Sequence, residues 1–366
     1  MTQQQIAAIA QHFQLKGEFL SAVELHSGNI NLTYHLIYDD RGARREYILQ
    51  RISTNVFHEP ERMMENIVHV TEHLRRALLA RGEDPGRRVL TIIPTREGGM
   101  MYSDPEAGCW RACPFITNAF AYDTVDAAAF YEVGRGFGAF QRMLADFPAG
   151  ELYESIPDFH NTVWRFEQLE QAIAADPVGR VREVRADIDF LMARREKLCS
   201  IIPLIESGEL PLRVTHNDTK SNNVMLDADT GKALCVIDLD TVMPGSALYD
   251  YGDAIRFGGN AAAEDEADTA KISLDMEKTE AFTRGFIGET NGFLTENELR
   301  RLPLGIYVMT GELAVRFLWD YISGDHYWKT DSPDHNLRRS RAQAALLRDV
   351  ERKEGELQAM VDRLIL

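Results

Sequence analysis

The sequence has few cysteines, no long apolar run and no excess of positive charge. Its cysteines are scattered, and no second Cys or His pair completes a zinc set, so we expect buried thiols rather than a zinc site. They are Cys109, Cys113, Cys199 and Cys235. No apolar run approaches the roughly 20 residues that a membrane helix needs. The first residues also lack the basic start and apolar core of a signal peptide, so we expect a cytoplasmic protein.

Positive charge is scarce. The 57 acidic residues outnumber the 40 lysines and arginines, and the formal net charge is -17. A surface this acidic repels phosphate backbones and anionic lipid heads, so we expect neither nucleic acid nor a membrane as a partner. A small anion such as a nucleotide is still compatible with this charge, because a few local groups and a metal outweigh the distant field.

The remaining composition is that of an ordinary folded protein. Hydrophobic residues make up 45% and charged residues 27% of the chain, which argues against disorder over most of its length. There is no internal repeat and no low-complexity linker. A length of 366 residues exceeds one small module and suggests two lobes, each with its own core.

The first third of the chain has the pattern of strands around one helix. Short apolar runs separated by Gly, Asn and Asp predict antiparallel strands. A proline at a first helical position, followed by apolar residues at helical spacing, predicts a helix over 60–81. Another helix is expected over 6–13, with strands over 19–26, 32–38, 47–52, 89–95 and 109–115. These elements would form a small antiparallel sheet with one helix between its third and fourth strands.

Beyond residue 115, helical spacing dominates. We expect helices over 123–147, 164–175, 182–206 and 338–364, a helical stretch from 279, and short strands over 212–215, 224–226 and 233–238. Three glycines lie inside the first of these helices rather than after a strand, which predicts close helix packing and not a phosphate loop. They are Gly134, Gly136 and Gly138.

Two segments of this part have a simple interpretation. In the last helix, Val350, Leu357 and Leu364 recur every seven residues. So short a repeat favours a helix docked on the core over a dimer seam. The acidic stretch 260–268 breaks the helical pattern, and we expect a solvated surface loop there.

The stretch from 214 to 240 contains the most informative polar residues. His216, Asp218, Lys220 and Asn223 follow one predicted strand, and Asp238 ends another. Phosphoryl transfer uses these groups: a carboxylate orients the attacking hydroxyl, an amide oxygen and a carboxylate bind magnesium, and a cation neutralises charge. The spacing H-x-D-x-K-x-x-N, followed by I-D, matches the catalytic loop and metal-binding Asp of protein kinases. Each residue alone would be read as a turn former or core histidine, but the joint pattern favours a kinase-like site.

These segments resemble the aminoglycoside phosphotransferase and choline kinase superfamily, whose fold is that of protein kinases, and more closely the bacterial N-acetylhexosamine 1-kinases. The shared blocks are GNINLTY at 28–34, YILQRI at 47–52, LRVTHNDTKSNNVMLD at 212–227, VIDLDTVMPGS at 236–246, YDYGDAIRFG at 249–258, RFLWDY at 316–321 and HNLRRSR at 335–341. The resemblance implies an α+β, two-lobed protein-kinase-like fold. A small antiparallel-sheet N-lobe (1–115) would bind the nucleotide, and a larger, mainly helical C-lobe (116–366) would carry catalysis and sugar binding.

The resemblance also implies a role for each matching position. Asp218 is the expected catalytic base facing the anomeric hydroxyl, and Asn223 and Asp238 are the expected Mg²⁺ ligands. His216 is expected to brace the loop, and Lys220 to reach the transferred phosphate or the sugar. The residues expected at ATP are Gly28, Asn29, Asn31, Thr33 and Gln50, with Phe115 and Ile116 in a hinge that meets adenine. The residues expected at the sugar are Asp218, Asn29, Asp253 and Arg316.

The third predicted strand departs from the wider kinase pattern. It carries Gln50 where most relatives have Lys or Arg, and strand alternation places Arg51 on the opposite face. In the phosphate turn Gly28 stands alone. Nucleotide phosphates must then rely on magnesium and turn amides. We assign no lysine–glutamate ion pair, although Glu65 on the helix is placed to face the strand.

Some charged residues keep two interpretations. Arg256 and Arg316 lie in largely apolar helical segments, where an unpaired charge is costly. Each either touches substrate or braces a loop through a salt bridge, for which Asp253 is a candidate partner. Asp240 is either part of the site or a loop carboxylate, and we take Asp227 as a loop carboxylate without a role.

The favoured function is an ATP- and Mg²⁺-dependent kinase that phosphorylates O1 of N-acetylglucosamine or N-acetylgalactosamine. A second hypothesis keeps the fold and takes a cation, an aminoglycoside or choline, which an acidic surface suits. Its pocket would need convergent carboxylates, for which the candidates are Asp250, Asp253, Glu264 and Asp265. A third hypothesis is an inactive nucleotide-binding protein, for which Gln50 is the best support. The preferred sugar and the choice between monomer and homodimer stay open.

Overall fold

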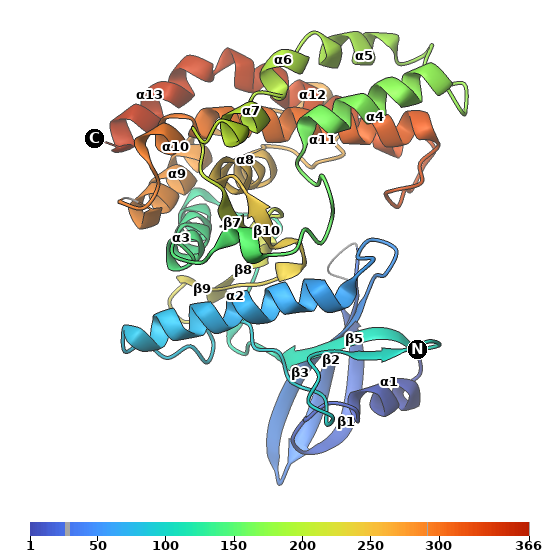
Figure 1. Ribbon diagram of the computed structural model, residues 1–366, viewed down its shortest axis with the longest axis vertical. Coiled ribbons are helices and arrows are strands. Elements are labelled where there is room, and N and C mark those ends of the chain that lie inside the picture. Colours follow the sequence, from blue (N-terminus) through green and yellow to red (C-terminus); the bar gives the residue numbers. More distant parts are fainter. Residues whose placement is uncertain (26–29, 291, 366) are drawn as a thin grey trace.

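The computed structural model describes residues 1–25, 30–290 and 292–365. Gly28 and Asn29, expected at the nucleotide, lie outside the described residues. The N-terminal part holds a five-stranded antiparallel sheet of order β1-β2-β3-β5-β4 (Figure 1). Its strands are β1 (Glu18–Leu25), β2 (Leu32–Asp40), β3 (Ala43–Ile52), β4 (Tyr102–Asp104) and β5 (Gly108–Pro114), and helix α1 (Gln3–Ala10) precedes them.

Helix α2 (Pro60–Ala80) lies between this sheet and the helical part of the molecule (Figure 1). It begins at Pro60, whose missing N–H is not needed in a first helical turn. Its buried face includes Met63, Ile67, Val70 and Leu74, at the spacing the sequence predicts. The predicted helix over 60–81 is therefore confirmed, and in the chain it lies between β3 and β4.

The predicted strand over 89–95 is wrong. Val89 and Ile93 are buried, as an apolar strand would be, but the segment forms only isolated bridges. The Ile93 amide donates to the Ala112 carbonyl at 2.8 Å, and Pro94 has no N–H with which to continue a ladder. The sheet is completed instead by the short strand β4, which the sequence did not indicate.

The C-terminal part is mainly helical. Its helices are α3 (Ala127–Met143), α4 (Thr162–Ala175), α5 (Arg185–Met192), α6 (Arg195–Leu198), α7 (Ile201–Glu206), α8 (Ala247–Gly258), α9 (Met276–Thr290), α10 (Glu296–Arg300), α11 (Leu302–Ser323), α12 (His335–Arg352) and α13 (Glu354–Ile365). Its short strands are β6 (Ala119–Phe120), β7 (Arg213–Thr215), β8 (Val224–Asp227), β9 (Ala233–Val236) and β10 (Met243–Gly245). They form the small antiparallel sheets β10-β7 and β6-β8-β9.

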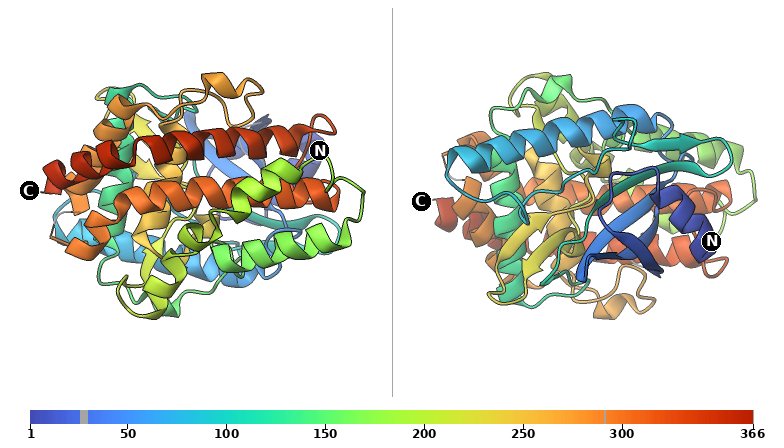
Figure 2. Two further views of the ribbon diagram at one scale, coloured as in Figure 1. Left: turned by 90° about the horizontal axis from the view of Figure 1, so that it is seen from above. Right: turned by 90° about the horizontal axis from the view of Figure 1, so that it is seen from below.

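Helix α11 is the centre of this part. It is buried along most of its length and packs against α12, α8 and α4, and Figure 2 shows the long helices lying side by side. Together with the N-terminal sheet, this gives the α+β architecture that the sequence predicts. Among the described residues, no helix has the length and apolar character that a membrane span requires.

Helices α3 and α9 approach each other closely through glycine. A methyl group at Gly134 would collide with the Phe282 carbonyl, and one at Gly138 with the Phe286 carbonyl. In α9, Gly285 has the same role toward the Tyr131 carbonyl. The interpretation of the glycine run as close helix packing is therefore confirmed.

Two predicted helices are shorter than expected. The stretch 182–206 is divided into α5, α6 and α7, with breaks at 193–194 and 199–200. The last helix is broken at Lys353, which separates α12 from α13 and donates its Nζ to the Leu274 carbonyl at 2.6 Å. Val350 and Leu357 are nonetheless buried in the main core, so the docked-helix prediction is confirmed.

Candidate active site

The loop after β7 is held by one carboxylate of α8. The backbone amides of His216 and Asn217 donate to the two oxygens of Asp250, at 3.0 and 2.8 Å. Asp250 also accepts from Gln141 at 2.6 Å and is fully buried. Asn217 has a positive φ of 64°, which asparagine tolerates better than most residues. The loop that contains Asp218 is therefore anchored on a rigid helix.

His216 connects the two halves of the predicted site. Its Nε2 donates to the Ile237 carbonyl at 2.9 Å, and its Nδ1 accepts from the Asp218 amide at 3.3 Å. These partners require the neutral tautomer with the proton on Nε2. The ring is fully buried against Phe137 and Phe140, so it positions the loop and does not reach a substrate.

Asp218 lies among the other residues of the predicted loop. Its carboxylate pairs with Lys220 Nζ at 2.9 Å, and its carbonyl accepts from the Asn223 amide nitrogen at 2.8 Å. Burial alone would raise the pKa of Asp218, but the Lys220 ammonium outweighs burial and holds that pKa below its usual value. Asp218 is therefore an ionised acceptor. Its side chain keeps 27% of its surface accessible, so a substrate hydroxyl can reach it.

Asp238 brings further negative charge to this place. It follows β9 with a positive φ of 59°. Asp238 is itself exposed, but partial desolvation by the surrounding protein, and then the charges of Asp240 and Asp218, raise its pKa to about 6. Such crowding of carboxylates favours the binding of a cation.

The donor set fits magnesium better than a metal held by protein alone. No cluster of three His, Cys, Asp or Glu side chains with metal-binding geometry occurs in the described part of the chain. Mg²⁺ in kinases typically takes one or two protein oxygens and completes its shell with phosphate oxygens and water. Asn223 donates through its amide nitrogen to Asp218, which leaves the amide oxygen for a cation. Asn223 and Asp238 are therefore a suitable pair of ligands.

The sheet presents a row of polar side chains to this site. Thr33, Gln50 and Arg111 are directly opposite one another on β2, β3 and β5, so they share one face. Gln50 Nε2 donates to Thr33 Oγ1 at 3.1 Å, and Arg111 Nε donates to Gln50 Oε1 at 3.0 Å. The row places the expected nucleotide residues Thr33 and Gln50 next to an arginine that sequence reasoning missed.

Arg111 and Asn31 connect the sheet to Asp240. Arg111 Nη1 forms an ion pair with Asp240, and Asn31 Nδ2 donates to the other carboxylate oxygen at 2.6 Å. Burial alone would lower the pKa of Arg111, but Asp240 and then Asp238 raise it above its usual value. Asp240 is therefore part of the site rather than a loop carboxylate. Glu65, which we expected to face the strand, is exposed, and Met64 lies beside Arg111 instead.

The hinge segment is held by an arginine outside the predicted site. The Phe115 amide donates to the Glu46 carbonyl at 3.0 Å, so it is not free for the contact with adenine that we expected. Arg87 donates to the carbonyls of Thr117 and Asn118, both at 2.9 Å, and pairs with Asp227 at 3.0 Å. Asp227 thus has a structural role, which corrects our expectation that it has none.

On the opposite side of the loop, Asp253 acts as a brace. Its Oδ2 accepts from the Thr219 amide at 3.0 Å, and its Oδ1 pairs with Arg256 at 2.9 Å. Arg256 also pairs with Glu264 at 2.6 Å. The salt bridge considered for Arg256 is present, and it draws part of the acidic loop 260–268 onto the protein, whereas we expected that loop to be solvated.

Arg316 does not pair with Asp253. Its ionic partner is Glu312, one turn earlier in α11, at 3.8 Å. Its guanidinium lies 4.9 Å from the ring of Phe159, 5.9 Å from Tyr327 and 5.4 Å from Trp328. The structure thus places Arg316 within an aromatic cluster, which sequence reasoning did not identify.

This aromatic cluster is connected to the loop of Asp218. Glu312 accepts from His160 Nδ1 at 2.8 Å, and His160 Nε2 contacts the Asn217 carbonyl at 3.1 Å. Asp320 fixes the segment that carries the aromatic rings, because it accepts from the amides of Tyr327 and Trp328 at 2.9 and 3.2 Å. Arg316 and the loop of Asp218 therefore belong to one connected site.

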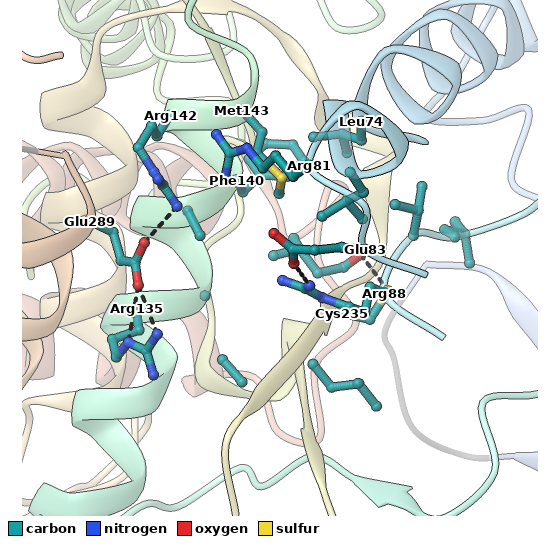
Figure 3. A pocket seen from close by; sticks show the side chains of 18 of the residues that line it. Leu74, Arg81, Glu83, Arg88, Arg135, Phe140, Arg142, Met143, Cys235 and Glu289 are labelled. Carbon is teal, nitrogen blue, oxygen red and sulfur yellow. Dashed lines mark hydrogen bonds and ion pairs between the residues drawn. The ribbon is translucent and has the colours of Figure 1, made fainter. Parts of the chain in front are cut away.

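A cavity of about 260 Å³ lies elsewhere, between α2, α3 and β9 (Figure 3). Glu289 lies there between Arg135 and Arg142, at 2.8 and 2.7 Å, and Glu83 pairs with Arg88. None of the residues that sequence reasoning assigned to the site lines this cavity. It is distinct from the candidate active site.

Comparison with known proteins identifies the family. The sequence matches the APH family, described as a phosphotransferase enzyme family, over residues 21–282. The microcompartment-associated aminopropanol kinase is similar in structure, with a TM-score of 0.63, 16% identity and coverage of 97% of this chain and 98% of that chain. A choline/ethanolamine kinase family protein from Mesorhizobium loti gives 0.55 and 15%, covering 100% and 99%.

A spectinomycin phosphotransferase, solved with ADP and spectinomycin, gives a TM-score of 0.54 at 15% identity and covers 99% of both chains. At such identities these structures establish only the shared kinase-like fold. The family match extends over most of the chain and includes the loop of Asp218 and Asn223 and the following Asp238. The protein therefore belongs to the APH phosphotransferase enzyme family.

Proposed function

We propose that this phosphotransferase is an ATP- and Mg²⁺-dependent anomeric kinase that phosphorylates O1 of an N-acetylhexosamine. The products would be the sugar 1-phosphate and ADP. The observation that carries the proposal is the position of Arg316 within an aromatic cluster connected to the catalytic loop. In this account residues 1–115 form the nucleotide-binding lobe and 116–366 the catalytic and sugar-binding lobe.

The aromatic cluster suits a neutral sugar better than a cation. Aromatic rings with a few fixed polar donors are typical of small-molecule pockets, and the donors of Arg316 match the acyl oxygen of an N-acetyl group. An aromatic cage that binds choline uses its rings to attract the ligand cation. Here the guanidinium of Arg316 already lies against those rings and would repel a second positive charge.

Three of the four carboxylates considered for a cationic substrate are already engaged. Asp250 accepts from two loop amides, and Asp253 pairs with Arg256 and the Thr219 amide. Glu264 pairs with Arg256, and Asp265 lies 3.3 Å from His335 Nε2. Asp265 is about half exposed and does not form a convergent set by itself, which supports the sugar over an aminoglycoside or choline.

In the proposed reaction, Asp218 orients the O1 hydroxyl and accepts its proton. A bond forms between O1 and the γ-phosphorus, the bond from that phosphorus to the β–γ bridging oxygen breaks, and ADP leaves. An anomeric hydroxyl is more acidic than an ordinary alcohol, so a carboxylate with a lowered pKa suffices as the acceptor. Lys220, which pairs with Asp218, would contact the phosphoryl group or the sugar. Asn223 and Asp238 would hold Mg²⁺, which supplies charge neutralisation when bound.

The similar structures keep one alternative open to test, because their names include choline, ethanolamine and spectinomycin kinases. The experiment measures ADP release from ATP and Mg²⁺ with N-acetylglucosamine, N-acetylgalactosamine, kanamycin, choline and aminopropanol in parallel. We expect release with the N-acetylhexosamines alone. Release with a cationic substrate alone would overturn the substrate, and bound ATP without release in any reaction would favour the inactive nucleotide-binding protein.

A further inference from the structure

The nucleotide side of the site has a deficit of positive charge. In protein kinases a lysine of the third strand pairs with the α- and β-phosphates, but here that strand carries the neutral Gln50. The facing loops add three carboxylates, Asp218, Asp238 and Asp240, and the charges of Asp218 and Asp240 both act on Asp238. Phosphate groups that approach this place need a cation on the sheet side.

Arg111 is the arginine that occupies this place. It is directly opposite Gln50 in the pairing of β3 and β5, so its side chain leaves the sheet on the same face, one strand further. It is 3% exposed, and its interactions with Gln50 and Asp240 orient its guanidinium toward the site. Arg51 is excluded, because it lies on the other face, where it approaches Gly108.

The hydrogen bonds of Arg111 leave part of its guanidinium available. Nε donates to Gln50, and Nη1 contacts Asp240 and, at 4.0 Å, Met64. Within residues 1–25, 30–290 and 292–365, Nη2 has no hydrogen-bond partner. Burying an arginine is costly unless its charge and donors are matched. A buried arginine with a free nitrogen is therefore a suitable donor for an anion.

We infer that Arg111 binds the phosphates of the nucleotide and replaces the cationic side chain that β3 lacks. Gln50 and Asp240 hold the guanidinium in place from two sides. The positively charged side chain thus belongs to β5 rather than to β3, on the same face of the sheet. The inference rests on the nucleotide-binding part of the proposed function and is independent of which acceptor is phosphorylated.

The test compares the binding of ADP and adenosine by calorimetry, in the presence of a metal chelator and without sugar. The Arg111→Gln variant should bind ADP roughly ten- to hundredfold more weakly, since hydrogen bonds to charged groups contribute this much. Adenosine lacks the phosphates, so its affinity should not change. Arg44→Gln, the same substitution at an exposed site of β3, should leave both affinities unchanged.

Two double variants separate direct binding from indirect effects. Removing Arg111 also leaves Asp240 without an ionic partner, and that carboxylate would itself repel phosphates. The pair Arg111→Gln with Asp240→Asn removes both charges and should still bind ADP weakly. Adding Gln50→Lys to Arg111→Gln returns a cation to β3 and should restore most of the ADP affinity.

Several results would overturn the inference. They are an equal loss of ADP and adenosine binding, an unchanged ADP affinity, or full recovery when Asp240 is also neutralised. If Arg111→Gln does not fold, the Arg111→Lys variant and the two double variants decide the question. A wild-type protein that discriminates ADP from adenosine but phosphorylates no sugar would contradict the sugar substrate and leave the role of Arg111 intact.

Discussion

The backbone amide, the carboxylate and the backbone carbonyl of Asp218 each have a hydrogen-bond or ion-pair partner. Its amide donates to His216, its carboxylate pairs with Lys220, and its carbonyl accepts from Asn223. His216 in turn donates to the carbonyl of Ile237, next to the proposed metal ligand Asp238. The proposed base and the proposed metal ligand are therefore connected by one buried ring.

The Asp218→Asn variant tests the role of this carboxylate. It keeps the shape of the side chain and removes the proton acceptor, so kcat should fall about a hundredfold or more while the KM for ATP changes little. Steady-state ADP release with saturating acceptor measures this. Asp189→Asn, at a side chain 60% exposed on α5, is the matched control and should be fully active. A loss of less than about tenfold at Asp218 would refute its role as the base.

At the scale of elements, one buried carboxylate of α11 connects this helix to the loop of Asp218. Glu312 is 0% exposed and contacts His160, Thr162 and Arg316. Burial alone would raise the pKa of Glu312, but His160 and then Arg316 outweigh burial and lower it. Its ionised form therefore stabilises the fold.

We expect Glu312→Gln to lower the free energy of unfolding by about 3 kcal/mol at neutral pH, because it leaves the buried Arg316 without a counter-ion. A carboxyl pKa that is lower in the folded state gives stability above the usual glutamate range, about 4.3, which is lost as the pH falls through the folded pKa. The difference from wild type should narrow below that range. Urea unfolding across pH measures it, and Glu296→Gln in an exposed i,i+4 pair is the control. A difference in the free energy of unfolding between Glu312→Gln and wild type that does not change with pH would contradict the role of the ionised carboxylate.

The packing of α3 on α9 depends on glycines at particular positions. A methyl group at Gly285 would meet the Tyr131 carbonyl, whereas one at Gly288 on the same helix would meet nothing within 4 Å. Gly285→Ala should therefore lower the free energy of unfolding by about 1–3 kcal/mol through overpacking. Thermal unfolding should show this as a lower melting temperature. Gly288→Ala should leave it unchanged or raise it, since alanine favours helices. Equal effects at both positions would show that helix propensity, not close approach, decides.

Helical spacing predicted α2, α3 and the docked last helix, because these elements bury one regular face. It did not predict the breaks at 193–194 or at Lys353, because a pattern of apolar positions continues across a local break. The apolar side chains of the segment 89–95 predict a strand. Whether an apolar run joins a ladder depends on its backbone partners, and here Pro94 and the course of the chain limit it to isolated bridges.

At the scale of the whole molecule, a few side chains connect the sheet to the helical part. Asn31 and Arg111 contact Asp240 from the sheet. Arg87 donates to the backbone carbonyls of Thr117 and Asn118 in the hinge segment. These contacts join segments far apart in the chain, such as those of Arg111 and Asp240, which are 129 positions apart. The spacing within the loop 216–223 was readable from the sequence, whereas the contacts across the molecule were not, because no local pattern encodes them.

The Arg87→Gln variant tests this connection. It removes the hydrogen bonds that Arg87 donates to the backbone carbonyls of the hinge segment. The amides of Ala119 and Ala228 lie where β6 meets β8, and we expect them to exchange hydrogen severalfold faster. Hydrogen exchange followed by mass spectrometry measures this. Arg88→Gln, at the next residue and in a pair with Glu83, should not change the exchange there. Unchanged hydrogen exchange in both variants would show that the hinge segment is held by the β6-β8-β9 sheet alone.

The central claim concerns the position of phosphate transfer, and the product tests it most directly. N-Acetylglucosamine and N-acetylgalactosamine would be converted with ATP and Mg²⁺, and the product examined by phosphorus and proton NMR. We predict phosphate on O1, with the anomeric proton coupled to phosphorus and the reducing end lost. Phosphate on another hydroxyl with the reducing end retained, or a product formed only from choline or kanamycin, would contradict the account.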